Sequence, residues 1–65
     1  MFNRIALEKE LVGMQMTYSD LAHRLGITRE TLRRRLNTGN FTRNEIEVLR
    51  DIFGIEAAEG FLFSK

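Results

Sequence analysis

The stretch TYSDLAHRLGITRETLRRRL, residues 17–36, predicts two short helices joined by a tight turn. Thr17 is placed to cap the first of these helices, and Asp20, three residues later, completes a capping box. Leu21 and the apolar residues that follow it have helical spacing. Gly26 then interrupts the pattern, because glycine readily adopts the left-handed backbone conformation that ends a helix.

The second helix of the pair is predicted over Arg29–Asn37, with Thr28 as its N-cap residue. Its apolar side consists of Leu32 and Leu36, which lie one turn apart. In the first helix, Ala22 suits a close crossing of the two helices, because a larger side chain would push them apart. Two helices with this spacing and turn are typical of a helix-turn-helix, whose second helix reads DNA.

Helices are also predicted on both sides of this pair. The helix over residues 2–14 has apolar residues on two sides, with Leu7, Leu11 and Met14 on the core-facing side and Phe2, Ile5 and Val12 on the other. A fourth helix opens with a second capping box, Thr42 and Glu45, and ends at Gly54; its core-facing residues are Ile46, Leu49, Ile52 and Phe53. Phe41 in the preceding loop is predicted to fill the core.

The C-terminal segment combines a short helical turn over residues 56–60 with three consecutive apolar residues, Phe61-Leu62-Phe63. Leaving such side chains exposed forgoes about 1.5–3 kcal/mol each and risks aggregation. Two arrangements remain open. The segment folds back over Phe2, Ile5 and Val12 of its own chain, or it contacts a second copy in a dimer.

The composition indicates one small domain, residues 1–65, with an all-α fold: a compact bundle of four or five helices. Cysteine and proline are absent, and no clustered ligands for a metal or cofactor occur. No nucleophile–base pair, carboxylate dyad or glycine-rich phosphate loop is present, so enzymatic activity and a small-molecule substrate are not expected. No membrane-spanning run or signal pattern occurs, and a complete cytoplasmic protein is expected.

The net charge of +1 conceals a segregation of charge along the chain. Residues 24–43 hold a single acidic residue, Glu30, and six arginines, for a net charge of +5; these are Arg24, Arg29, Arg33, Arg34, Arg35 and Arg43. The remaining residues have four basic and eight acidic side chains, for a net charge of −4. Such a distribution presents one side of the domain to a polyanion.

The pattern of residues around the turn resembles the Cro-type phage repressor superfamily. The matching positions are Leu21-Ala22, Leu25-Gly26-Ile27-Thr28, Thr31-Leu32 and Leu36-Asn37. The likeness extends over nearly the whole chain and is closest to short Cro-like proteins of phages and integrated elements of Gram-positive bacteria. This resemblance implies a λ-repressor-like DNA-binding domain that represses or switches the promoters of a mobile element.

The second helix of the pair supplies most of the candidate DNA contacts. On a helical wheel, Arg34 lies opposite the core residues and is flanked by Glu30 and Asn37. The resemblance implies base contacts from Arg29, Glu30, Thr31 and Arg34. For Glu30 an ion pair with Arg33 or Arg34 is an equally good interpretation.

Phosphate contacts are predicted from the edges of the same helix and from its neighbours. Arg33 and Arg35 lie at the edges, Thr17 and Tyr18 at the N-terminus of the preceding helix, and Arg43 beyond the following loop. The candidate DNA-binding residues are therefore Thr17, Tyr18, Thr28, Arg29, Glu30, Thr31, Arg33, Arg34, Arg35, Asn37 and Arg43.

The leading hypothesis is a homodimeric, sequence-specific regulator that binds the major groove of double-stranded DNA. One alternative is a protein-interaction module on the same fold, such as an antagonist of a repressor. Another is an excisionase-like architectural DNA binder. The cluster of arginines on one helix favours DNA over a protein partner, since an interaction module does not require it.

Overall fold

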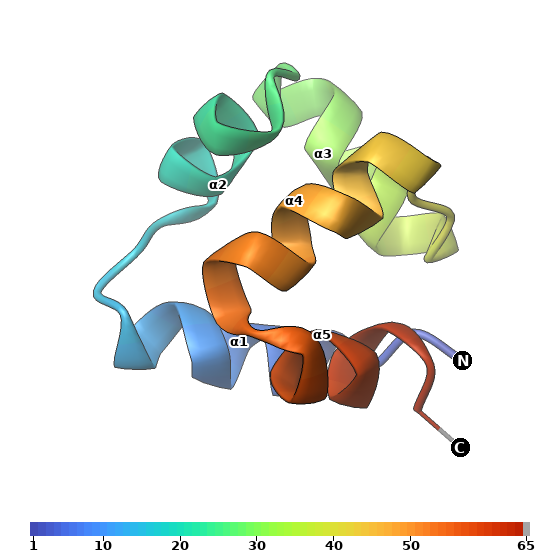
Figure 1. Ribbon diagram of the computed structural model, residues 1–65. Coiled ribbons are helices and arrows are strands. Elements are labelled where there is room, and N and C mark those ends of the chain that lie inside the picture. Colours follow the sequence, from blue (N-terminus) through green and yellow to red (C-terminus); the bar gives the residue numbers. More distant parts are fainter. Residues whose placement is uncertain (65) are drawn as a thin grey trace.

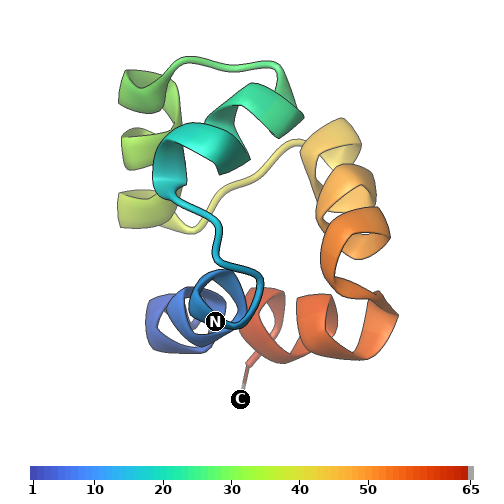
Figure 2. The ribbon, with the colours of Figure 1, turned by 90° about the vertical axis from the view of Figure 1, so that its left-hand side faces the viewer.

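The computed structural model describes residues 1–64, and this part of the chain is all-α, with five helices and no strand. The helices are α1 (Arg4–Gly13), α2 (Tyr18–Leu25), α3 (Arg29–Thr38), α4 (Arg43–Phe53) and α5 (Ile55–Leu62). In Figures 1 and 2, α1 and α5 lie side by side at one end of the molecule, and α2 packs on α3 at the other. Helix α4 spans the two ends, packing on both α2 and α5.

The starts of α2, α3 and α4 are where the capping residues predict them. Thr17 and Asp20 form a complete capping box at α2, as do Thr42 and Glu45 at α4. The Thr28 hydroxyl oxygen accepts a hydrogen bond from the first turn of α3 at 3.1 Å. These three predictions are confirmed, because a cap satisfies N–H groups that the helix itself leaves unpaired.

The end of α3 is one residue later than predicted. The Thr38 hydroxyl donates to the Arg34 carbonyl oxygen at 3.0 Å, within the last turn of the helix. Gly39 then caps the helix with a φ of +73°. A Cβ atom on this residue would lie 2.8 Å from Cβ of Phe2, so both the backbone conformation and the close approach of the N-terminal segment require glycine.

Each helix contributes one large, fully buried side chain to a single core. These side chains are Leu7, Leu21, Leu32, Leu49 and Phe61. Burial of an apolar side chain of this size stabilises the fold by about 1.5–3 kcal/mol. Because every helix is attached to the same core, the position of α3 depends on all four of the others. No helix in the described part of the chain is long and apolar enough to cross a membrane.

The C-terminal segment is more helical than predicted. Helix α5 runs from Ile55 to Leu62, rather than over residues 56–60, and includes the first two residues of the apolar segment. Phe61 is fully buried, with its ring edge-on to those of Phe53 at 5.6 Å and Phe2 at 6.4 Å. The fold-back arrangement is therefore confirmed for Phe61, which packs on Phe2. Leu62 is buried in the core, while Phe63 remains 55% exposed.

Helix α1 departs from the prediction at both ends. It begins at Arg4, with Asn3 as the cap, so that Phe2 precedes the helix and packs on Phe41, which joins the core as predicted. At the other end α1 stops at Gly13, and the chain turns through residues 14–15. The prediction that Met14 faces the core is therefore wrong, because this residue lies beyond the helix and is exposed.

The C-terminal segment covers only part of the second apolar side that was predicted for residues 2–14. Phe2 contacts Phe61, but Ile5 and Val12 are 68% and 76% exposed. Of the two arrangements left open, the fold-back is thus observed over Phe2, whereas Ile5 and Val12 are left uncovered. α5 packs on the other face of α1, which carries the buried Leu7 and Leu11.

Candidate nucleic-acid interface

The turn between α2 and α3 holds the two helices in a fixed relation. Gly26 adopts a left-handed conformation with a φ of +72°, and the Ile27 N–H donates to the Ala22 carbonyl oxygen at 3.0 Å. Ala22 is 3% exposed, and Ile27 packs against the core beneath the turn. This arrangement anchors one side of α3 and leaves the opposite side free.

The free side of α3 carries the polar residues that the helical wheel placed there. Leu32 and Leu36 are buried, whereas Glu30, Arg34 and Asn37 are exposed. Arg34 Nη2 donates to the Thr31 hydroxyl oxygen at 3.3 Å, which holds the guanidinium over the first turn of the helix. An arginine on the exposed face of such a helix can form two hydrogen bonds with guanine.

Glu30 was predicted either to contact a base or to pair with Arg33 or Arg34. No ion pair between this carboxylate and Arg33 or Arg34 is present within residues 1–64. The pairing alternative is therefore not realised here, and base contact by Glu30 stays a prediction.

Arg35 points to α4 rather than to the exposed face. Its Nε donates to Glu45 Oε1 at 2.9 Å and its Nη2 to Oε2 at 3.3 Å. Glu45 is 5% exposed and also accepts from the Thr42 N–H at 2.9 Å. Burial raises the pKa of the Glu45 carboxyl, but the hydrogen bonds from Arg35 and Thr42 outweigh burial and hold this pKa below its usual value.

This bidentate pair changes the interpretation of Arg35. Breaking the pair would leave the negative charge of a buried carboxylate without a partner, which is unfavourable. Arg35 therefore links α3 to α4. The phosphate contact predicted for Arg35 would therefore require this ion pair to break. The capping box placed Glu45 at the start of α4 in the sequence. That Arg35 lies beside this carboxylate could not be predicted, because it depends on how the two helices are arranged in space.

The N-terminus of α2 combines capping with a tyrosine that contacts α1. The Thr17 hydroxyl is used within the capping box, so only the first-turn N–H groups of α2 remain for a phosphate. The Tyr18 hydroxyl donates to Glu8 Oε2 at 2.8 Å. Burial, together with the hydrogen bond to Glu8, raises the pKa of Tyr18, so its hydroxyl keeps its proton near neutral pH.

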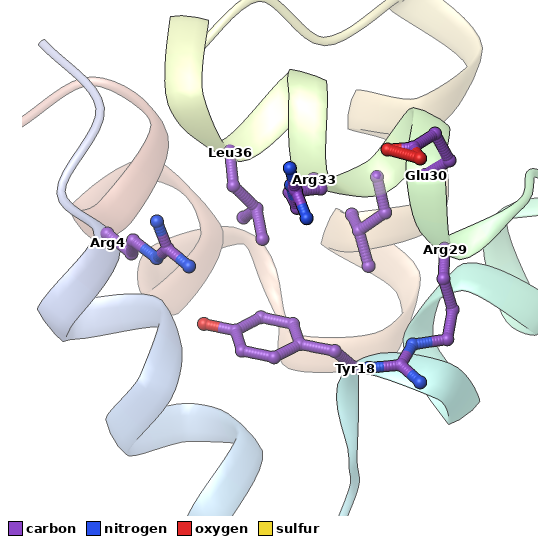
Figure 3. A pocket seen from close by; sticks show the side chains of 7 residues that line it. Arg4, Tyr18, Arg29, Glu30, Arg33 and Leu36 are labelled. Carbon is purple, nitrogen blue, oxygen red and sulfur yellow. The ribbon is translucent and has the colours of Figure 1, made fainter.

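A groove of about 320 Å³ lies between α1, the start of α2 and α3 (Figure 3). Its basic lining residues are Arg4, Arg29 and Arg33, and Tyr18 and Glu30 contribute further polar groups. Arg29 thus lines this groove at the first turn of α3. Arg4 is absent from the predicted site, because it lies on a different helix and outside the basic segment of the sequence.

The opposite flank of α3 is formed by the loop before α4 and by the first residue of that helix. Arg43 begins α4 and is exposed beside the capping residue Thr42. Thr28, at the start of α3, uses its hydroxyl for capping and for a 3.0 Å hydrogen bond to Thr31. The predicted residues therefore lie along α3, the start of α2 and the start of α4, and among them Arg35 is the one whose side chain pairs with Glu45.

Two short helices joined by a glycine turn, the second with an arginine-bearing exposed face, define a helix-turn-helix domain of the class that binds DNA. A model of the Cro/C1-type helix-turn-helix DNA-binding domain matches residues 6–59 of the 65, and the chain belongs to this family. No curated protein and no solved structure matches the chain significantly.

Proposed function

We propose that this protein is a sequence-specific transcriptional regulator that binds operators as a homodimer and represses promoters of a phage or other mobile element. The observation that carries the proposal is the exposed face of α3, on which Arg34 lies between Glu30 and Asn37 in a Cro/C1-type domain. Repression and a mobile-element origin follow from the resemblance to short Cro-like proteins.

In this proposal α3 enters the major groove with its N-terminal end foremost. Arg29, Glu30, Thr31 and Arg34 contact base edges, where arginine pairs with guanine and glutamate accepts from cytosine. Arg33, Arg43 and the first turn of α2 bind backbone phosphates on the two sides of the groove. The phosphate contacts fix the register of α3, and the base contacts select the sequence.

The size of the domain supports a dimer. Its longest dimension is 27 Å, which is shorter than one turn of DNA, about 34 Å. One copy therefore reaches a single half-site, and specific affinity requires a second. Exposed apolar side chains suited to contact between copies are Ile5 and Val12 on α1 and Phe63 after α5.

Selection of binding sites from random DNA, followed by footprinting on the best site, tests this function. We expect a palindrome whose half-sites are centred about one helical turn apart, because a two-fold dimer requires that spacing. Protected direct repeats with bent DNA would instead indicate an excisionase-like architectural protein. Failure to enrich any sequence, with no affinity for random DNA, would favour the protein-interaction module.

Substitution of two neighbouring arginines should separate base recognition from phosphate binding. Arg34→Ala is expected to cost about 1–3 kcal/mol on the selected site and to relax the preference at one base position. Arg33→Ala should weaken binding to selected and random DNA alike, because a phosphate is common to every sequence. Fluorescence anisotropy with both DNAs measures the two effects. If both variants bind as wild type does, the assignment of α3 is incorrect.

A further inference from the structure

Two groups on different helices converge on one carboxylate oxygen where α1 meets the start of α2. Glu8 Oε2 accepts the hydrogen bond from the Tyr18 hydroxyl at 2.8 Å and lies 3.7 Å from Arg4 Nε. Arg4 and Tyr18 are also lining residues of the groove that Arg33 borders, and Figure 3 shows the Arg4 guanidinium and the Tyr18 hydroxyl pointing toward each other there. An anionic oxygen is thus already held at this place by a cation and a hydroxyl donor.

The contact between Arg4 and Glu8 is easily exchanged for another anion. Their side chains are 47% and 49% exposed, and their closest polar atoms lie beyond hydrogen-bond distance. An exposed pair one helical turn apart contributes little to stability. The Arg35–Glu45 pair, by contrast, has two hydrogen bonds, a closest distance of 2.9 Å and a buried carboxylate.

The surroundings of this oxygen favour a phosphate. The adjoining groove is lined by three arginines and a single carboxylate, that of Glu30. Tyr18 is the first residue of α2, at a helix end that attracts anions. Its raised pKa keeps the hydroxyl as a donor, and a phosphate oxygen can accept from it as the Glu8 carboxylate does.

We propose that Arg4 and the Tyr18 hydroxyl bind a phosphate of the DNA backbone next to Arg33, and that Glu8 occupies this position in the free protein. The proposal rests on the proposed DNA-binding function and extends it to α1. Glu8 then acts as an internal competitor, because its carboxylate must leave Arg4 and Tyr18 and is repelled by the incoming phosphate. Each protomer gains one phosphate contact from outside the helix-turn-helix, and Glu8 lowers the affinity for every sequence.

Affinity for a short random duplex, measured over a series of salt concentrations, tests the proposal in three variants. Arg4→Gln should weaken binding about fivefold per protomer at near-physiological salt and make the plot of log K against log salt shallower by roughly 1 per protomer. Tyr18→Phe should weaken binding without changing that slope, because it removes a neutral donor. Glu8→Gln should strengthen binding severalfold, since glutamine can still accept from Tyr18 but has no charge.

Glu47→Gln is the matched control for Glu8→Gln, since it makes the same charge change at an exposed position on α4. Glu8→Gln should increase the affinity for DNA more than the control does. This increase in affinity should be smaller when Arg4→Gln is also present. Equal gains in the two glutamine variants, or an unchanged slope in Arg4→Gln, would overturn the proposal. The proposed function would still stand if Arg34→Ala lost specific binding, whereas a wild-type protein that binds no DNA would refute both. Circular dichroism establishes that each variant is folded.

Discussion

Raising the salt concentration from about 50 to 200 mM should weaken DNA binding by the dimer roughly 250- to 15,000-fold. This expectation follows from four to eight phosphate contacts per dimer, which give a slope of log K against log salt of roughly −4 to −7. The contacts come from Arg33, Arg43 and the start of α2 in each protomer. Arg35 is excluded, because its charge is already compensated by Glu45. Titration of a labelled duplex at several salt concentrations gives the slope directly.

Two variants show whether the slope reports these contacts. Arg43→Gln should make the slope shallower by roughly 2 in the dimer, one unit for each protomer. Lys9→Gln removes an equal charge from an exposed position on α1 and should leave the slope unchanged. A slope near zero in the wild-type protein would contradict DNA binding and favour a protein partner.

Replacing Phe61 with alanine should cost about 3–5 kcal/mol of folding free energy. The ring is fully buried and packs edge-on against those of Phe2 and Phe53, so its loss leaves a cavity between the N-terminal segment, α4 and α5. The total stability of a chain of 65 residues is of the order of 3–10 kcal/mol, so the variant should lose about a third of its stability or more. Thermal unfolding followed by circular dichroism measures the loss.

Phe63→Ala provides the matched control, because it makes the same substitution two residues later at a side chain that is 55% exposed. A surface substitution of this kind usually changes stability by less than about 0.5 kcal/mol. If the two variants melt at similar temperatures, Phe61 is not part of the core that holds α5. If Phe63→Ala instead weakens dimerisation without loss of folding, Phe63 belongs to the proposed contact between copies.

Phe2 connects the core around α5 to the C-terminal end of α3. Phe2 contacts Phe61 on one side and packs directly over Gly39, the C-cap of α3, on the other. Core substitutions in α5 should therefore reduce DNA binding through loss of the fold, with specific and random DNA affected together. Substitutions on the exposed face of α3 should leave melting unchanged.

Most helix boundaries could be predicted from the sequence because capping is local. Thr17, Thr28 and Thr42 each bond a backbone N–H three residues later, within the range over which sequence spacing is informative. The glycines after α2 and α4 ended those helices as predicted. The predicted extent was wrong at both ends of α1, at the last residue of α3 and in α5.

Sequence alone determined the all-α fold, the helix-turn-helix and the segment that holds most of the positive charge, since each depends on spacing along the chain. Tertiary structure decided which charges are free. Arg34 and Arg35 are neighbours in sequence, but the second is neutralised by Glu45 because the first turn of α4 places this carboxylate beside it. Arg4 lies outside the basic segment and still borders the same groove as Arg33, because α1 packs beside the start of α2. Electrostatic partners are selected by distance in space, and that distance is set by the core that all five helices share.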